Sequence, residues 1–261
     1  MDLTNQKTLT AVLKKHGLWA KKRFGQNFLI NKEVLQKTLV TGGISKKDHV
    51  VEVGPGLGTL TVELCKKAGK VTSIEADKFI IPALKDTTKE FKNLQIIQKD
   101  ALKVEPPKSK YKVIANIPYN ITSPLLSHFL HNKNRPEKIV FLMQKEVAEK
   151  ITDIKKQSVL SLQVQIFGEP KIIATVPPES FHPAPKVTSS ILEINVYKTP
   201  LSKNPEKILA LAKKAFTLKR KKLRNSIGTN AAEFENRRPE TLTIQEWDVL
   251  AETISSDELV S

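Results

Sequence analysis

The sequence is poor in cysteine and has no long apolar run. Its 261 residues include a single cysteine, Cys65, which cannot form an internal disulfide. This favours a reducing, cytoplasmic setting. No apolar stretch is long enough to cross a bilayer, so we expect no membrane-spanning segment. Residues 1–6 lack the charged start and apolar core of a secretion signal. Internal repeats and low-complexity tracts are absent as well.

Acidic residues are scarce relative to basic ones. The chain has 27 Asp and Glu against 43 Lys and Arg, which gives a net charge of +16 and a pI of about 9.7. Such a charge predicts a polyanionic partner, either nucleic acid or an anionic membrane. The length is sufficient for one complete α/β core and a small second unit.

One glycine-rich stretch organises the rest of the chain. Val50–Val53 predicts a short buried strand, Gly54, Gly56 and Gly58 follow at alternate positions, and a helical pattern begins at Thr59. This order opens a nucleotide-binding α/β unit, because a glycine has no Cβ to keep a ligand from the backbone. A dinucleotide fingerprint reads G-x-G-x-x-G. Here the third glycine comes one residue early, a spacing that suits S-adenosylmethionine better than a pyrophosphate.

Two further predicted strands each end at or near an acidic residue, Glu75 in one and Asp100 in the other. They are Lys70–Glu75 and Asn93–Ala101, and a predicted helix connects them. Strands that alternate with helices indicate a parallel sheet, which binds ligands at the carboxyl ends of its strands. Gly54, Glu75 and Asp100 would meet there. Glu75 follows the first glycine by roughly 20 residues, the spacing at which nucleotide folds place a carboxylate on ribose hydroxyls.

A fourth predicted strand, Val113–Ala115, runs into the tetrad Asn116, Ile117, Pro118 and Tyr119. An exocyclic adenine amine is a poor nucleophile because its lone pair is delocalised into the ring. The Asn116 amide oxygen and the Ile117 carbonyl can accept its N–H groups and return electron density to nitrogen. Pro118 stiffens the turn, and Tyr119 offers a flat face for base stacking.

Two later strands, Lys171–Val176 and Ser190–Val196, enclose a proline-rich loop. We expect this loop to present Phe181 as the second face of a base sandwich. His182 is not assigned as a base, because nothing near it in the sequence would orient it. No set of Cys and His residues has metal-ligand spacing, so we predict no metal site.

The pattern changes near Thr199, where strand signals stop. Helices are predicted at Pro205–Leu218, Lys222–Ile227 and Thr243–Ile254. We therefore expect an S-adenosylmethionine-binding α/β domain over residues 1–198 and a helical domain over residues 199–261. A basic cluster between the first two helices is predicted to contact RNA phosphates: Lys219, Arg220, Lys221, Lys222 and Arg224.

Four motifs together resemble those of the ribosomal RNA adenine N6-dimethyltransferases: Phe24–Leu29, Glu52–Gly58, Asn116–Ile121 and Phe181–Val187. Residues 215–226 and 242–247 resemble the branch that acts on small-subunit RNA. The resemblance covers nearly the whole chain, although residues 157–161 lack the Tyr-Gly pair and longer loop usual in the family. It implies a Rossmann-like class I methyltransferase sheet, mostly parallel with an antiparallel last strand, and a small all-helical C-terminal domain.

The resemblance also implies an activity and a set of site residues. The activity is dimethylation of two adjacent adenosines in the 3′-terminal hairpin of small-subunit (16S) RNA, with S-adenosylmethionine, during subunit biogenesis. The implied catalytic set is Asn116, Ile117, Pro118, Tyr119 and Phe181. The implied cofactor set is Asn27, Leu29, Gly54, Gly56, Glu75, Asp100, Ala101 and Asn116. Within it, Glu75 would hold the ribose and Asp100 the adenine amine.

Two alternatives remain open. The sister enzyme of large-subunit (23S) RNA, which confers macrolide resistance, shares the sheet and the tetrad but not the C-terminal segments. A non-catalytic RNA-binding or assembly factor would have lost the tetrad or the glycine turn, and both are intact here. The favoured interpretation implies an immature small ribosomal subunit as partner, and we expect the protein to act as a monomer.

Overall fold

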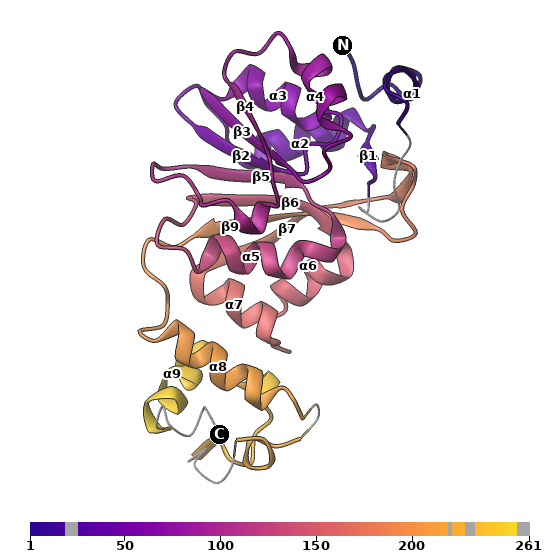
Figure 1. Ribbon diagram of the computed structural model, residues 1–261. Coiled ribbons are helices and arrows are strands. Elements are labelled where there is room, and N and C mark those ends of the chain that lie inside the picture. The colour runs from indigo at the N-terminus through magenta and orange to yellow at the C-terminus, as the bar shows by residue number, and fades with distance from the viewer. Residues whose placement is uncertain (19–25, 219–220, 228–232, 255–261) are drawn as a thin grey trace. The chain divides into compact units, whose positions relative to one another are not determined.

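The computed structural model describes residues 1–18, 26–218, 221–227 and 233–254 (Figure 1). The chain forms two compact units. The first comprises Met1–Ala148 and Lys171–Val196, and the second comprises Glu149–Pro170 and Tyr197–Ser261. The chain passes from the first unit to the second between residues 196 and 197, close to the boundary predicted near residue 199. Residues 149–170 were expected in the α/β domain, but they belong to the second unit.

A seven-stranded sheet forms the centre of the first unit. Its strands are β2 His49–Val53, β3 Lys70–Glu75, β4 Leu94–Gln98, β5 Lys112–Asn116, β6 Lys138–Gln144, β7 Gly168–Val176 and β9 Ser189–Val196. They lie in the order β4-β3-β2-β5-β6-β9-β7. The pairs from β4 to β6 are parallel, whereas β9 runs antiparallel to β6. The predicted mostly parallel sheet with an antiparallel last strand is therefore confirmed.

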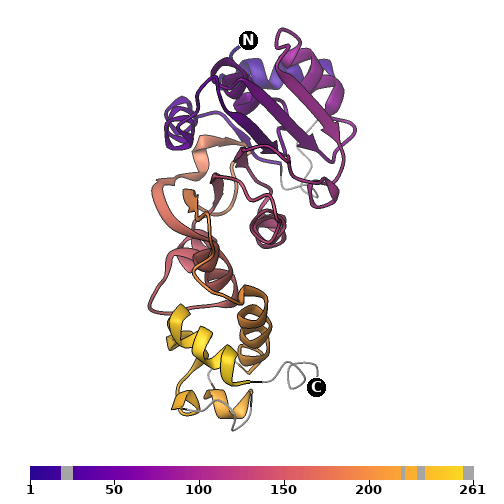
Figure 2. The same ribbon diagram turned by 90° about the vertical axis from the view of Figure 1, so that its left-hand side faces the viewer.

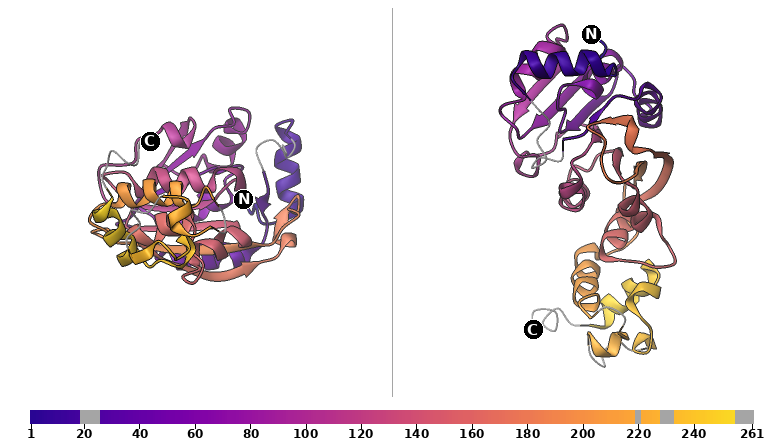
Figure 3. Two further views of the ribbon diagram at one scale, coloured as in Figure 1. Left: turned by 90° about the horizontal axis from the view of Figure 1, so that it is seen from below. Right: turned by 90° about the vertical axis from the view of Figure 1, so that its right-hand side faces the viewer.

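Several helices accompany these strands: α1 Gln6–Lys15, α2 Lys32–Gly42, α3 Thr59–Lys67, α4 Ile81–Thr88, α5 Thr122–Leu130 and α6 Lys145–Thr152. Figure 3 gives two further views of the sheet and the helices. Asn31 caps α2: its side-chain oxygen accepts the N–H groups of Glu33 and Val34 at 2.9 and 3.1 Å. Gly43, with φ +52°, ends the helix. In the part of the chain described, no helix combines the length and apolar character needed to span a membrane.

Helix α5 begins without a side-chain cap. Its cap residue is Ile121, which makes no side-chain hydrogen bond. A 3₁₀ turn over Tyr119–Ile121 leads directly into the helix, so Thr122 is already helical. Its hydroxyl donates backwards to the Tyr119 carbonyl at 3.3 Å.

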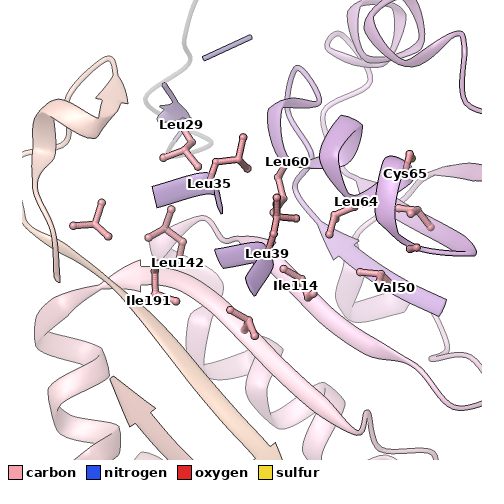
Figure 4. Close-up of a cluster of buried hydrophobic side chains, with 14 of the residues drawn as sticks. Leu29, Leu35, Leu39, Val50, Leu60, Leu64, Cys65, Ile114, Leu142 and Ile191 are labelled. Carbon is pink, nitrogen blue, oxygen red and sulfur yellow. The ribbon is translucent and has the colours of Figure 1, made fainter. Parts of the chain in front are cut away.

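One large hydrophobic cluster lies between the sheet and helices α2 and α3. Leu35 and Leu39 of α2 and Leu60 and Leu64 of α3 are buried against strand residues that include Ile114 (Figure 4). Strands buried in this way consist of nearly continuous apolar residues, as in parallel sheets covered by helices. This packing fixes the strand ends from which the site is built.

A two-stranded sheet was not anticipated from the sequence. Strand β1, Phe28–Leu29, pairs antiparallel with β8, Phe181–His182. The Ile30 N–H extends the contact by donating to the Ser180 carbonyl at 2.8 Å. The predicted proline-rich loop and the N-terminal segment therefore hold each other through backbone hydrogen bonds.

The second unit is helical in its described residues beyond 200. It contains α7 Val159–Phe167, α8 Pro205–Ala215 and α9 Ile244–Thr253. Helices α8 and α9 lie side by side (Figure 2). Between them, the ring centroids of half-buried Phe216 and fully buried Trp247 are 6.4 Å apart. The helix predicted over residues 222–227 is shorter, a single 3₁₀ turn at Leu223–Asn225. Helix α7 packs against α8, and this explains why residues 149–170 join this unit.

Candidate active site

A cavity of about 290 Å³ opens at the carboxyl ends of the parallel strands in the first unit. Strands β2, β3, β4 and β5 each contribute residues at or just after their last position. Eleven residues predicted from the sequence line it: Asn27, Leu29, Gly54, Gly56, Glu75, Asp100, Ala101, Asn116, Ile117, Pro118 and Tyr119. The sheet topology thus brings together residues that lie up to 92 positions apart in the chain.

Phe181 is the member of the predicted catalytic set that does not line this cavity. Its side chain is 3% exposed and belongs to the hydrophobic core, because β8 pairs it with Leu29. In this conformation the ring has no open face for a base. The expected second face of a base sandwich is therefore not present in this structure.

The glycine turn between β2 and α3 needs its glycines. Gly54, Gly56 and Gly58 have φ values of +67°, +57° and +93°, a region that other residues rarely adopt. A Cβ on Gly54 would lie 3.4 Å from the Pro118 ring, and one on Gly56 would lie 3.2 Å from the Phe28 ring. The turn consequently packs against both the tetrad and the N-terminal segment of the cavity wall.

Glu75 closes the turn from the adjacent strand. Its two carboxylate oxygens accept the N–H groups of Gly56 at 3.2 Å and Asp77 at 2.9 Å. Burial raises the pKa of this carboxyl, and the two backbone donors oppose the shift. The carboxylate is thereby held in place at the cavity wall, where it can accept further hydrogen bonds from ligand hydroxyls.

Glu52 is a cavity residue that the sequence arguments missed as a site residue. It is 1% exposed and accepts the hydroxyls of Thr61 at 2.7 Å and Ser73 at 2.6 Å. Burial raises the pKa of the Glu52 carboxyl to about 7, although the two hydroxyl donors lower it in part. The sequence signal that could have identified Glu52 is an acidic residue within an otherwise apolar strand that was predicted to be buried.

The N-terminal segment also contributes unpredicted contacts. Gln26 lines the cavity, and its side-chain amide donates to an Asp77 carboxylate oxygen at 3.3 Å. Phe28 lines it as well and lies against Gly56. These contacts tie the segment to the loop that follows β3.

The tetrad begins at the last residue of β5. The Asn116 amide nitrogen donates to the Asn27 carbonyl at 3.1 Å, which orients the amide because a carbonyl can only accept. Ile117 is 2% exposed, and its N–H donates to the Leu142 carbonyl at 3.2 Å. The Tyr119 hydroxyl lies 2.7 Å from the Ser189 hydroxyl. Every one of these contacts crosses between separate segments of the chain.

The basic cluster lies in the second unit. Lys221, Lys222 and Arg224 are exposed around Leu223, which is fully buried. Lys219 and Arg220 fall outside the described residues. The Leu223 and Arg224 N–H groups donate to backbone carbonyls of residues 237 and 235, so the turn that carries the cluster is held in place.

The strand order and the antiparallel last strand define a class I methyltransferase fold, and solved structures agree. A dimethyladenosine transferase from Plasmodium falciparum has a TM-score of 0.75 and 26% identity, over 85% of this chain and 95% of that one. A structure described as the 23S rRNA methyltransferase ErmE has a TM-score of 0.72 and 26% identity, over 87% and 99%.

Sequence comparison then identifies the family. The family model for ribosomal RNA adenine dimethylase matches residues 17–254, and the chain belongs to this family. Its relatives include proteins named ribosomal RNA small subunit methyltransferase A. The one from Alkaliphilus oremlandii is 34% identical over 97% of this chain and 98% of that protein. The one from Clostridium botulinum is 36% identical over 93% and 97%.

Proposed function

We propose that this protein dimethylates the N6 amines of two adjacent adenosines in the 3′-terminal hairpin of small-subunit (16S) ribosomal RNA. S-adenosylmethionine is the proposed methyl donor. The observation that carries the proposal is the position of Asn116, whose amide lines the same cavity as Gly54 and Glu75. The full-length relatives named small subunit methyltransferase A support this choice of RNA.

We propose a setting together with this function. The substrate particle is an immature small subunit, met in the cytoplasm during its biogenesis, and the protein acts as a monomer. In this proposal the first unit binds the cofactor and the basic cluster of the second unit contacts RNA phosphates.

The cavity residues fit the proposed cofactor. The cavity volume of about 290 Å³ lies just below the range of roughly 300–1,000 Å³ usual for ligand pockets. Gly54 leaves the backbone open to the methionine part, Glu75 suits the ribose hydroxyls, and Asp100 suits the adenine amine. Leu29 and Ala101 supply apolar surface in the same lining. When bound, S-adenosylmethionine supplies a methyl group made electrophilic by its sulfonium sulfur.

The tetrad supports the acceptor half of the proposal. Because Asn27 engages the Asn116 nitrogen, the Asn116 oxygen is the amide atom that accepts an N–H of the target amine. The Ile117 carbonyl would accept the other, and Tyr119 would stack on the base. Both acceptors stabilise the positive charge that develops on nitrogen as it attacks. No side chain is assigned as a general base, because the amine loses its proton only after attack.

The second candidate is the 23S rRNA enzyme, and the similarity to ErmE is the observation in its favour. That enzyme class would use the same cavity and tetrad on a different RNA. The C-terminal segments and the full-length relatives favour the small subunit.

The experiment that separates these candidates uses both ribosomal substrates. The purified protein is incubated with labelled S-adenosylmethionine and either immature small subunits or precursor large subunits, and the modified bases are mapped. We expect label on two adjacent adenosines of the small-subunit RNA alone. Label on large-subunit RNA would favour the second candidate. Absence of label on both, with an intact fold, would favour a non-catalytic assembly factor.

A further inference from the structure

Among the described residues, the side chain of Tyr119 makes one hydrogen bond, through its hydroxyl. The proposed chemistry gives this hydrogen bond no role. The Tyr119 backbone is held in the 3₁₀ turn, where the Ile121 N–H donates to the Pro118 carbonyl at 3.2 Å and the Thr122 hydroxyl donates to the Tyr119 carbonyl at 3.3 Å. Neither contact restricts rotation of the ring. The hydroxyl at the tip of the ring meets the Ser189 hydroxyl at 2.7 Å.

Ser189 is rigidly placed. It is fully buried and is the first residue of β9, where it lies opposite Gln144 at the end of seven consecutive paired positions. The preceding carbonyl, of Thr188, accepts the Lys145 N–H at 3.0 Å. Strand β9 thus cannot shift Ser189 without breaking its register with β6. The Ser189 hydroxyl is therefore a fixed point to which the Tyr119 ring is attached.

We propose that Ser189 is a positioning residue, which holds the ring of Tyr119 in the orientation that receives the target base. This role rests on the proposed function. A ring without this contact would populate other rotamers, and only a fraction of the molecules would present the stacking face. The apparent affinity for the flipped-out base falls in proportion to that fraction.

The neighbouring residue provides a matched control. Ser190 lies on the same strand and is also fully buried, but among the described residues its hydroxyl has no hydrogen-bond partner. Replacing Ser190 by alanine removes the same atom from the same strand without touching Tyr119. Any general effect of a smaller side chain in β9 therefore appears in both variants.

The experiment is a double-mutant cycle on methyl transfer to immature small subunits. Ser189→Ala and Tyr119→Phe are each expected to lower kcat/KM about three- to tenfold, the effect of removing one hydrogen bond. The double variant should be no slower than either single variant, because each change removes the same hydrogen bond. Ser189→Thr keeps a hydroxyl and should recover most of the rate. Ser190→Ala should match the wild type, and cofactor affinity by calorimetry should be unchanged throughout.

Three results would overturn the role. Ser189→Ala at wild-type rate would show that the contact does not matter for methyl transfer. Defects that multiply in the double variant would show that Ser189 and Tyr119 act independently. A Ser189→Ala defect that appears equally in cofactor affinity would indicate a general structural effect. These results arise in an active enzyme and leave the proposed function intact, whereas a wild type that methylates neither ribosomal particle overturns the proposed function and this role together.

Discussion

Two carboxyl groups in the cavity wall have different surroundings. Glu75 accepts two backbone N–H groups, whereas Glu52 accepts two side-chain hydroxyls and is almost completely enclosed. Burial raises the pKa of both, and that of Glu52 reaches about 7. At the scale of single residues, Glu52 is therefore a group whose charge costs stability.

This cost predicts how Glu52→Gln changes the dependence of stability on pH. The ordinary pKa of 4.5 applies in the unfolded chain, while the folded value is about 7, so the folded state binds more protons between these values. The contribution of Glu52 to the free energy of unfolding thus falls as pH rises through this window. Between about pH 5 and pH 8 the wild type should lose roughly 2–3 kcal/mol relative to the variant. Urea unfolding of both proteins at about pH 5 and pH 8 measures this difference. An equal change in the free energy of unfolding of the wild type and the variant would show that the pKa of Glu52 is not raised.

Asn116 is the residue on which the proposed chemistry depends most. Asn116→Ala removes the oriented amide and should lower turnover about 10²–10³-fold, because the developing charge then lacks one acceptor. The measurement is a single-turnover rate at saturating cofactor and ribosomal substrate. Thermal unfolding of the same variant checks that the fold is retained. Near-normal turnover would mean that the tetrad has a structural role only.

At the scale of elements, the glycine turn joins three parts of the cavity wall. Its backbone contacts Glu75 of the neighbouring strand, Pro118 of the tetrad and Phe28 of the N-terminal segment. The Phe28 ring lies so close to Gly56 that it would have to move by a few tenths of an ångström if a Cβ were added there. The turn is thus as much a packing surface as a binding loop.

Gly56→Ala tests this double role. The positive φ of +57° and the Phe28 ring, 3.2 Å from the new Cβ, should together cost about 1–3 kcal/mol of stability and lower cofactor affinity. Gly43→Ala is the matched control, because its φ is +52° but its Cβ would meet nothing within 4 Å. The control should lose stability yet keep its affinity in calorimetry. Unchanged affinity in Gly56→Ala would separate the turn from the cofactor site.

At the scale of the whole molecule, the basic residues behind the net charge of +16 do not all contribute equally to RNA binding. Phosphate contacts position a nucleic acid without reading its sequence. Exposed Lys221, Lys222 and Arg224 are carried on a turn anchored by buried Leu223. Because one anchored turn presents several cations together, we propose the basic cluster as a phosphate-binding surface.

Replacing Lys221, Lys222 and Arg224 by glutamine should weaken binding to small subunits without changing cofactor affinity. The slope of log affinity against log salt should become shallower by about two to three units, near one for each phosphate that the variant no longer neutralises. The measurement is a salt titration of particle binding by wild type and variant.

The control removes three exposed lysines elsewhere: Lys47, Lys67 and Lys70. These lie near the amino ends of β2 and β3, at the opposite edge of the sheet from the cavity. The control should keep the wild-type slope. Equal slopes in all three proteins would place the RNA contacts on other basic residues.

Much of the fold and of the candidate site was predictable, because the relevant signals are local. The strand before Gly54 and the strand that ends at Glu75 are confirmed where predicted. Parallel pairing then places strand ends on one edge, so Glu75 and Asn116 can be assigned to one cavity before any side chain is seen.

Contacts between distant segments were not predictable. Phe181 was expected at the cavity, yet pairing with Leu29, 152 residues away, buries it in the core. Residues 149–170 show a helical pattern, but a pattern does not say which unit covers the apolar face. Glu52 is one polar position in an apolar strand, and its role becomes visible only with Thr61 and Ser73 placed around it.

Local sequence alone specifies the alternating strands and helices of the parallel sheet, the glycine turn, the acidic residue at a strand end and the tetrad, since each follows from periodicity or turn chemistry within a few residues. Tertiary packing specifies how these parts are held: Asn116 by Asn27, and Tyr119 by Ser189. These hydrogen bonds join residues 89 and 70 positions apart in the chain. Their partners are selected by the packing of the whole sheet, which no local pattern encodes.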